Sequence, residues 1–254
     1  MSSVFITGAS SGIGAALARR YAAQGAIVGL VARRNEGLQN LAAELGAKAW
    51  TCAGDVGDPG FMRDAAADFS ARHGLPDVVI ANAGVSVGTL GSEPDDLAVL
   101  ERTLRTNVLG LAATLQPFVT PMRGRGHGTL VGIASMAGWR GLPGAGAYSA
   151  SKAAVFAWLE SLRVELHGTG VAVVTICPGY IDTPMTRVNP YRMPFLLSAE
   201  IGARRIARAI DAGRSLAVIP WQMRVVSWGL RLLPNWLYDR LFARAPHKPR
   251  NLPG

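Results

Sequence analysis

The chain has 254 residues, 30 of them Gly and 15 Pro, and a formal net charge of +9. A chain of this length can bury a large core, and its glycines and prolines are spread along it, so the composition excludes a disordered or low-complexity protein. Its two cysteines, Cys52 and Cys177, and its four scattered histidines lack metal-ligand or redox spacing, so the sequence predicts no metal site and no disulfide.

A glycine-rich turn comes first. A short apolar run, residues 4–6, ends in Thr7-Gly8-Ala9-Ser10-Ser11-Gly12-Ile13-Gly14, and an amphipathic segment follows. Strand, glycine turn and helix in this order is the setting of a dinucleotide site, with the helix N-terminus offering N–H groups to phosphates. Gly8 would permit the tight turn, Gly12 the approach of a pyrophosphate, and Gly14 the packing of helix on strand. The spacing differs from the commoner Gly-x-Gly-x-x-Gly, so a purely structural glycine turn is the alternative.

The next strand, residues 26–31, is an unbroken apolar run that ends in Ala32-Arg33-Arg34. An NAD site usually carries an acid here to hold the ribose 2′-hydroxyl, whereas arginine suits the 2′-phosphate of NADP. The acid is missing and two guanidinium groups stand in its place, so the sequence favours NADP(H) over NAD(H). The alternative is that Arg33 and Arg34 are solvated residues at the start of the next helix.

Strand and helix patterns then alternate to residue 219. This alternation predicts an α/β fold: a Rossmann-like, doubly wound, mostly parallel seven-stranded sheet with helices on both faces. We expect one catalytic domain over residues 1–220 and a C-terminal helical extension over residues 221–254. After the segments above, the expected strands are 47–52, 77–81, 129–134, 171–177 and 215–219; the expected helices are 15–24, 59–73, 94–122 with a bend near Gly110, 147–167 and 199–212.

Tyr148 and Lys152 lie four residues apart in the helix expected over 147–167, so they share one face. A phenol normally ionises near pH ~10, too high for useful proton transfer at neutral pH. An ammonium roughly 4 Å away would favour the phenolate strongly enough to bring that pKa close to neutrality. The pair could therefore perform acid–base chemistry. Taken alone, the same spacing also fits a surface Tyr and Lys on any amphipathic helix.

The remaining motifs remove that ambiguity. Ser135 lies 13 residues before Tyr148, and Asn107 precedes both. In this order and spacing the chain resembles the short-chain dehydrogenase/reductase family, in its single-domain branch. The one departure is Ala81 before Asn82, where the family often has a second Asn. The motifs that carry the resemblance run from the glycine turn through Asp55-Val56, Asn82-Ala83-Gly84, Asn107, Ser135, Tyr148 with Lys152, and Pro178-Gly179, to Thr183.

The resemblance implies a role for each motif. Tyr148 is the general acid or base, Lys152 lowers its pKa and binds the nicotinamide ribose, Ser135 binds the substrate oxygen, and Asn107 holds a water that links Lys152 to solvent. Plainer roles stay open for Asp55 as a turn residue, Asn82 as support for the sheet edge and Ser135 as a strand-end cap. The implied cofactor-binding residues are Gly8, Ser10, Ser11, Gly12, Ile13, Gly14, Arg33, Arg34, Asp55, Val56, Asn82, Ala83, Gly84, Tyr148, Lys152, Pro178, Gly179, Ile181 and Thr183.

The expected activity is that of an NADP(H)-dependent oxidoreductase that interconverts a ketone or aldehyde and an alcohol. Residues 184–198 resemble the family's substrate lid, and their apolar character indicates a small hydrophobic substrate. Arg187 or Arg192 could meet an acidic group on it or be solvated. A non-catalytic NADP-binding scaffold or sensor is the alternative function. The apolar residues expected at the substrate are Met185, Met193, Phe195, Leu196 and Leu197, with Trp139 and Leu142 opposite.

The C-terminal extension carries most of the charge. Residues 201–254 hold ten Lys and Arg against Asp211 and Asp239, whereas residues 1–200 hold 16 basic and 15 acidic residues. Arg224, Ser227, Trp228 and Arg231 are expected on one helical stripe, and a second short helix is expected after Pro234. Trp, Leu and Phe beside Arg fit a helix in a membrane interface, a cap on the substrate pocket, or a subunit interface.

The aliphatic bulk of this extension argues against nucleic acid as its partner. The first residues lack the basic and long apolar regions of a signal peptide, so we expect a cytoplasmic protein, with contact to the cytoplasmic face of a membrane left open. The resemblance further implies a homodimer or homotetramer that pairs through the helices containing Asn107 and Tyr148.

Overall fold

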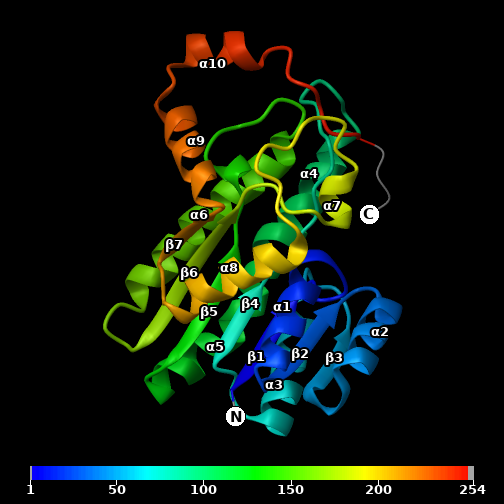
Figure 1. Cartoon of the computed structure of the whole chain (residues 1–254), viewed down its shortest axis with the longest axis vertical. Helices are drawn as coiled ribbons and strands as arrows, with labels where there is room; N and C mark the ends of the chain where they lie inside the picture. The colour runs from blue at the N-terminus through cyan, green and yellow to red at the C-terminus, as the bar shows by residue number, and fades with distance from the viewer. Residues whose placement is uncertain (1, 251–254) are drawn as a thin grey trace.

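A computed structural model describes residues 2–250 and contains a seven-stranded sheet in the order β3-β2-β1-β4-β5-β6-β7 (Figure 1). Every neighbouring pair is parallel, which confirms the predicted doubly wound α/β fold. All seven strands lie where the apolar runs predicted them. Their bounds are β1 (Ser3–Thr7), β2 (Ile27–Ala32), β3 (Ala49–Ala53), β4 (Val78–Ala81), β5 (Gly128–Ile133), β6 (Val171–Pro178) and β7 (Leu216–Ile219).

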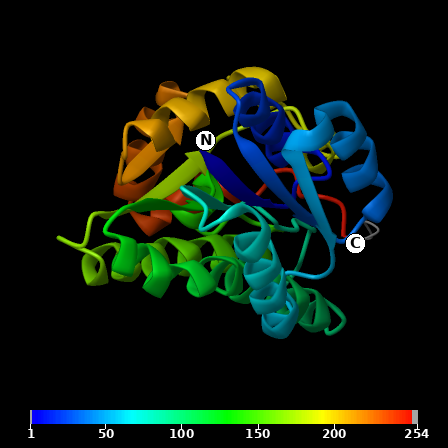
Figure 2. The same ribbon diagram turned by 90° about the horizontal axis from the view of Figure 1, so that it is seen from below.

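Helices cover both faces of the sheet (Figure 2). One buried cluster joins the sheet to α1, α2 and α8, and a second joins it to α3, α5 and α6. The helices α2 and α7 were not among the predicted elements, whereas the others follow the predicted segments. The helices up to β7 are α1 (Gly12–Ala23), α2 (Asn35–Leu45), α3 (Pro59–His73), α4 (Asp96–Leu104), α5 (Gly110–Arg125), α6 (Gly146–Glu165), α7 (Pro184–Arg187) and α8 (Ala199–Asp211).

Alternation along β1 shows how the sequence builds the two layers. Val4 and Ile6 belong to one buried cluster, whereas Phe5, between them, belongs to the other. The Phe5 ring lies 5.4 Å from that of Phe69 on α3 and 5.2 Å from that of Phe118 on α5. Burying each such ring stabilises the fold by roughly 1.5–3 kcal/mol, so a strand with apolar residues on both faces requires helices on both sides.

The expected bend near Gly110 is a change of helix type. Between α4 and α5 the chain forms one π-helical turn, Arg105–Leu109, and α5 begins at Gly110. A Cβ at Gly110 would lie 2.7 Å from Val56 Cγ2, so glycine allows the helix to approach the loop after β3. π-turns inside helices often occur at functional sites. Here the turn contains Asn107, whose side chain is buried.

Beyond β7 the chain forms α9 (Trp221–Leu232) and α10 (Asn235–Phe242), and residues 243–250 then run back toward α4 and α7 (Figure 1). The predicted stripe on α9 is wrong in one respect: Ser227 is buried and faces the protein with Met223, while Trp228 faces outward. No helix within residues 2–250 is long and apolar enough to cross a bilayer.

Candidate functional site

A cavity of about 410 Å³ opens at the carboxyl ends of the parallel strands. Ligands of open α/β sheets gather at this edge, because each strand delivers its following loop there. Nearly all predicted site residues line the cavity; Gly14 and Asn107 lie behind its wall. The predicted residues that line it are Gly8, Ser10, Ser11, Gly12, Ile13, Arg33, Arg34, Asp55, Val56, Asn82, Ala83, Gly84, Ser135, Tyr148, Lys152, Pro178, Gly179, Ile181 and Thr183.

The glycine turn forms the floor of one end. Gly8 and Gly12 have φ values of 67° and 56°, a conformation that favours glycine. A Cβ at Gly14 would overlap the carbonyl oxygen of Gly8, so this residue allows α1 to pack on the turn, as expected. The Ser11 side chain makes no capping bond to the start of α1. The first N–H groups and the positive end of the helix dipole therefore lie at the cavity, an arrangement that fits a pyrophosphate.

Asn82 braces the turn from the neighbouring strand. Its Nδ2 donates to the carbonyl oxygens of Thr7 at 3.0 Å and Gly8 at 3.2 Å. The Thr7 hydroxyl in turn accepts from the backbone N–H groups of Asn82 at 3.2 Å and Ala83 at 3.3 Å. These bonds tie the ends of β1 and β4 together, so the geometry gives Asn82 the supporting role that its position at the sheet edge allowed.

Two exposed arginines follow β2 at the rim of the cavity. Arg34 Nη2 donates to Ser11 Oγ at 3.2 Å and to Ser10 Oγ at 3.4 Å, so its guanidinium lies against the glycine turn. Asp55 is the one acidic side chain among the described lining residues, and it follows β3 rather than β2. Its Oδ1 accepts from the Gly57 N–H at 2.9 Å and so closes a turn.

At the other end of the cavity, Tyr148 and Lys152 occupy successive turns of α6, and Ser135 follows β5. Burial raises the pKa of Tyr148, and a hydrogen bond with Ser135 opposes this rise. Burial also lowers the pKa of Lys152 to about 8. The predicted net shift of the tyrosine pKa toward neutrality is therefore wrong for this geometry. The ammonium lies 5.7 Å from the centre of the phenol ring and donates to the Ile133 carbonyl oxygen at 2.7 Å.

Asn107 lies behind Gly84, whose Cβ position would be 3.2 Å from Asn107 Oδ1 and 3.8 Å from Lys152 Nζ. Its Oδ1 accepts from the Val85 N–H at 2.8 Å, and its Nδ2 donates to the Val85 carbonyl oxygen and to Ser151 Oγ, both at 2.9 Å. Asn107 therefore connects the loop after β4 with the helix that carries Tyr148 and Lys152.

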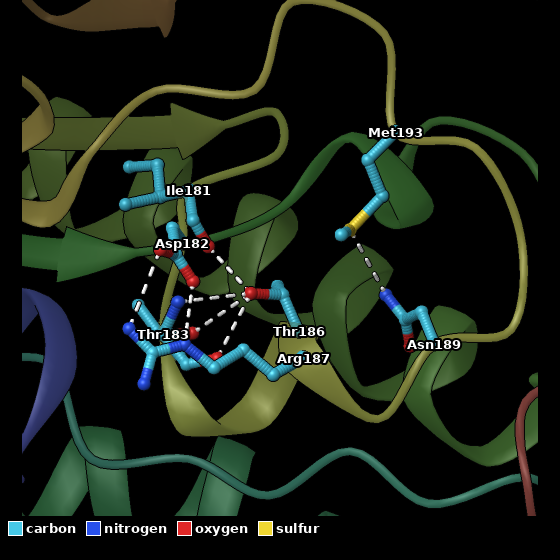
Figure 3. Close-up of polar contacts among 7 residues, drawn as sticks. All are labelled: Ile181, Asp182, Thr183, Thr186, Arg187, Asn189 and Met193. Atoms are coloured by element: carbon cyan, nitrogen blue, oxygen red, sulfur yellow. Dashed lines mark hydrogen bonds and ion pairs between the residues drawn. The ribbon is translucent and has the colours of Figure 1, made fainter.

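A small network shapes the segment after β6 (Figure 3). The Thr186 hydroxyl donates to the Ile181 carbonyl oxygen at 2.6 Å and accepts from the Thr183 N–H at 3.0 Å, which caps the short helix α7. Thr183 in turn lies opposite Gly12, whose Cβ position would be 3.1 Å from Thr183 Cγ2. This cap holds the start of the predicted lid against the glycine turn.

The lid meets its predicted substrate role only in part. Arg187 Nε donates to Asp182 Oδ1 at 2.7 Å, so this guanidinium is already paired, while Arg192 stays exposed. Among the apolar residues expected at the substrate, Met185 lines the cavity. Trp139 is turned away: its Nε1 donates to Cys177 Sγ at 3.3 Å, and it borders a second groove beside Trp228. Phe195 is half exposed.

Residues near the C-terminus add contacts that sequence reasoning missed. Lys248 is 8% exposed, and its Nζ donates to Ser86 Oγ at 3.1 Å and to the Met185 carbonyl oxygen at 3.0 Å; both acceptor residues line the cavity. Burial lowers the pKa of Lys248 to about 8. Arg250 pairs with Asp96 and Glu93, each at 3.0 Å. A single Lys near a basic terminus gave no signal of such burial, because that pattern normally indicates a solvated side chain.

The cavity thus joins phosphate-binding and proton-transfer features. Its length runs from an uncapped helix N-terminus and two guanidinium groups to a phenol, a hydroxyl and a buried ammonium. Within residues 2–250 no group of three or more His, Cys, Asp or Glu side chains could hold a metal ion. These residues fit an anionic dinucleotide whose reactive end lies beside a proton donor.

Comparison with known proteins agrees with this interpretation of the cavity. Residues 2–192 match the family model of the short chain dehydrogenases. An uncharacterized oxidoreductase of Myxococcus xanthus is 39% identical over 237 residues, which are 92% of this chain and 93% of the relative. A short chain dehydrogenase/reductase from Burkholderia phymatum in complex with NAD superimposes with a TM-score of 0.82, at 25% identity, over 99% and 98% of the two chains. The closed form of a serine dehydrogenase with NADP+ gives 0.75, at 28% identity, over 91% and 90%.

The fold, the cavity and these similarities define a nucleotide-binding oxidoreductase. The chain belongs to the short-chain dehydrogenase family. Because one similar structure holds NAD and another NADP+, the similarities leave the preferred cofactor of this chain unassigned.

Proposed function

We propose that this protein is an NADP(H)-dependent reductase of small hydrophobic ketones or aldehydes, with Tyr148 as the general acid. The observation that carries the proposal is that Tyr148, Ser135 and Lys152 line the same cavity as the glycine turn. A scaffold or sensor that only binds the nucleotide has no need of this second group of residues. We assign catalysis to residues 1–220 and treat the C-terminal extension, which the structure describes up to residue 250, as lying beside the cavity.

The preference for NADP(H) rests on charge at the end of β2. Arg33 and Arg34 are exposed there, and Arg34 already lies against Ser10 and Ser11. A guanidinium offers several N–H donors and permanent charge to a 2′-phosphate. No acid follows β2 directly to bind a ribose 2′-hydroxyl in its place. The pair therefore distinguishes the phosphorylated cofactor from the unphosphorylated one.

The chemistry follows from the three residues at the far end of the cavity. The chemistry that a reduced nicotinamide would supply when bound is transfer of a hydride to the carbonyl carbon. Ser135 donates a hydrogen bond to the carbonyl oxygen and orients it toward Tyr148. Tyr148 transfers its phenolic proton to that oxygen, and the buried Lys152 ammonium stabilises the phenolate that forms. Because burial raises the Tyr148 pKa, the phenol holds its proton at neutral pH, which suits reduction.

The substrate side of the cavity supports a small apolar substrate. Met185, Val87 and Val188 line it, and Lys248 connects the loop after β4 with the helix α7 through Ser86 and Met185. The helices containing Asn107 and Tyr148 are the proposed pairing surface of a homodimer or homotetramer.

A panel of carbonyl compounds tests the proposal. Purified protein is incubated with NADPH or NADH and with ketones that range from small to acyl-chain and polycyclic, while the absorbance of the reduced cofactor is followed. We expect turnover with at least one apolar carbonyl and a higher kcat/KM for NADPH. A higher kcat/KM for NADH would overturn the cofactor assignment. NADPH binding without oxidation by any carbonyl would favour the scaffold.

A further inference from the structure

The outer face of α9 is a continuous apolar stripe. Trp221, Val225, Trp228 and Leu232 are 68%, 65%, 58% and 77% exposed. Their spacing of i, i+4, i+7 and i+11 places all four on one side of the helix. Single exposed apolar residues are ordinary, but four in line on one helix form a surface that water solvates poorly.

The next helix extends this surface. On α10, Trp236 is 69% and Leu241 is 59% exposed, while Tyr238 is buried and its hydroxyl donates to the Gly141 carbonyl oxygen at 2.7 Å. The inner sides of both helices therefore pack against the rest of the protein. In Figure 1, α9 and α10, drawn in orange and red, project beyond the carboxyl end of the sheet. We call the exposed apolar stripe of α9 together with Trp236, which lies opposite the buried Tyr238 on α10, the tryptophan face; its residues are Trp221, Val225, Trp228, Leu232 and Trp236.

Positive charge accompanies the tryptophan face. Arg224, Arg231, Arg240 and Arg244 are exposed on or directly after the two helices. Among the described residues none of these four forms an ion pair with a carboxylate, although other exposed arginines do. The basic surplus of residues 201–254 thus lies in part beside exposed aromatic and aliphatic side chains, whereas residues 1–200 are almost neutral.

We propose that the tryptophan face binds the surface of an anionic phospholipid bilayer, with α9 and α10 lying in the plane of the interface. Tryptophan prefers the headgroup region, leucine and valine reach the acyl boundary, and arginine attracts anionic lipids. Charge decides between this partner and a second copy of the chain. Two copies joined through the tryptophan face would bring two sets of unpaired arginines together, whereas an anionic surface neutralises them. Neither helix is long enough to span a bilayer.

Vesicle co-sedimentation tests the binding. The full-length protein is mixed with vesicles of phosphatidylcholine alone or of phosphatidylcholine with phosphatidylglycerol, at low and high salt. We expect binding to the mixed vesicles, at least about tenfold stronger than to the neutral ones, that weakens with salt, since each arginine near an anionic surface contributes roughly fivefold. Tryptophan emission should shift to the blue on binding, because Trp221, Trp228 and Trp236 leave water.

Two sets of variants separate the contributions. The triple variant Trp221→Ser, Leu232→Ser, Trp236→Ser removes the most exposed apolar groups and should lose at least about tenfold in binding. The variant Arg224→Gln, Arg240→Gln should lose binding at low salt. Leu97→Ser and Arg63→Gln are the matched controls, because these exposed residues lie on α4 and α3. Circular dichroism and the carbonyl assay monitor folding, which substitutions of exposed groups should preserve.

The result that overturns the proposal is equal sedimentation with neutral and anionic vesicles, or unchanged binding of the triple variant. Size-exclusion chromatography without lipid gives the other decisive outcome. If the triple variant is a smaller oligomer than the parent protein, a second copy covers the tryptophan face and the bilayer does not.

Discussion

Asn107 and Ser151 share a buried hydrogen bond of 2.9 Å that links the π-helical turn to the helix carrying Tyr148. The Ser151 hydroxyl in turn donates to the Tyr148 carbonyl oxygen at 2.7 Å, one turn earlier in the same helix. Asn107 also holds both the N–H and the carbonyl oxygen of Val85. A polar network therefore joins the backbone of Tyr148 to the loop after β4.

Ser151→Ala tests whether this network positions Tyr148 independently of cofactor binding. Loss of the hydroxyl leaves the buried Asn107 amide short of an acceptor, which should lower the free energy of unfolding by about 1–3 kcal/mol. Misplacement of Tyr148 should reduce kcat by roughly tenfold or more. We expect the Kd for NADPH to stay unchanged. Ser161→Ala, on the exposed face of the same helix, is the matched control. Unchanged kcat in Ser151→Ala would show that the network does not position the phenol.

Tyr148→Phe tests the proton donor directly. The ring remains and the hydroxyl is lost, so the variant should bind NADPH with the same Kd while kcat falls by at least about a hundredfold. Tyr21→Phe, on α1 outside the cavity, should retain full activity and so controls for loss of a tyrosine hydroxyl. Fluorescence titration and initial rates give the two quantities. Near-normal turnover in Tyr148→Phe contradicts the assignment of the general acid.

Much of the framework could be predicted from the sequence because it depends on local patterns. Apolar runs marked the strands, and strand order and motif spacing then brought residues as distant as Arg33 and Tyr148 to one edge of the sheet. The orientation of Trp139 could not be predicted, because its contact with Cys177 depends on how a loop packs over β6. The direction of the Tyr148 pKa could not be predicted either. Spacing alone gives proximity to Lys152, but burial and the ammonium's bond to the Ile133 carbonyl oxygen depend on the tertiary structure.

The two directions of the reaction should respond to pH with opposite sign. Reduction needs the protonated phenol, and burial raises the pKa of Tyr148, so the rate of ketone reduction should stay level through neutral pH and fall only under alkaline conditions. Alcohol oxidation needs the phenolate and should rise with pH over the same alkaline range. Profiles of kcat/KM against pH, measured with NADPH and with NADP+, check both limbs. If the rate of reduction already falls near neutral pH, the bound cofactor lowers the Tyr148 pKa and so reverses the effect of burial.

Removal of the two guanidinium groups after β2 should alter cofactor preference. In Arg33→Gln, Arg34→Gln the KM for NADPH should rise by roughly tenfold or more, since hydrogen bonds to charged groups contribute about 1.5–3 kcal/mol each. The KM for NADH should change little. Arg63→Gln, an exposed arginine on α3 outside the cavity, is the matched control. Equal increases in both KM values would indicate that the arginines bind a part common to the two cofactors.

Residues 243–250 should become more mobile when the ion pairs of Arg250 are removed. Arg250→Gln removes the pairs with Asp96 and Glu93, and with them part of what holds the Pro249 carbonyl oxygen 3.0 Å from the Gly88 N–H. We expect the Gly88 amide to exchange hydrogen with solvent several-fold faster. Arg72→Gln removes an exposed ion pair with Asp68 on α3 and should leave that exchange unchanged. The same rate in Arg250→Gln and the parent protein would show that the pairs do not hold this segment in place.

The seven-stranded framework supplies the glycine turn, Ser135, Tyr148 and Lys152. Two segments outside this framework, residues 184–198 and 243–250, are joined beside the cavity by the hydrogen bond from Lys248 to the Met185 carbonyl oxygen. Under the proposed function, reaction type and substrate selectivity are thereby encoded in separable stretches of polypeptide. Random libraries confined to these two segments would explore new substrates while the catalytic apparatus stays intact, which makes the fold a practical starting point for engineered biocatalysts.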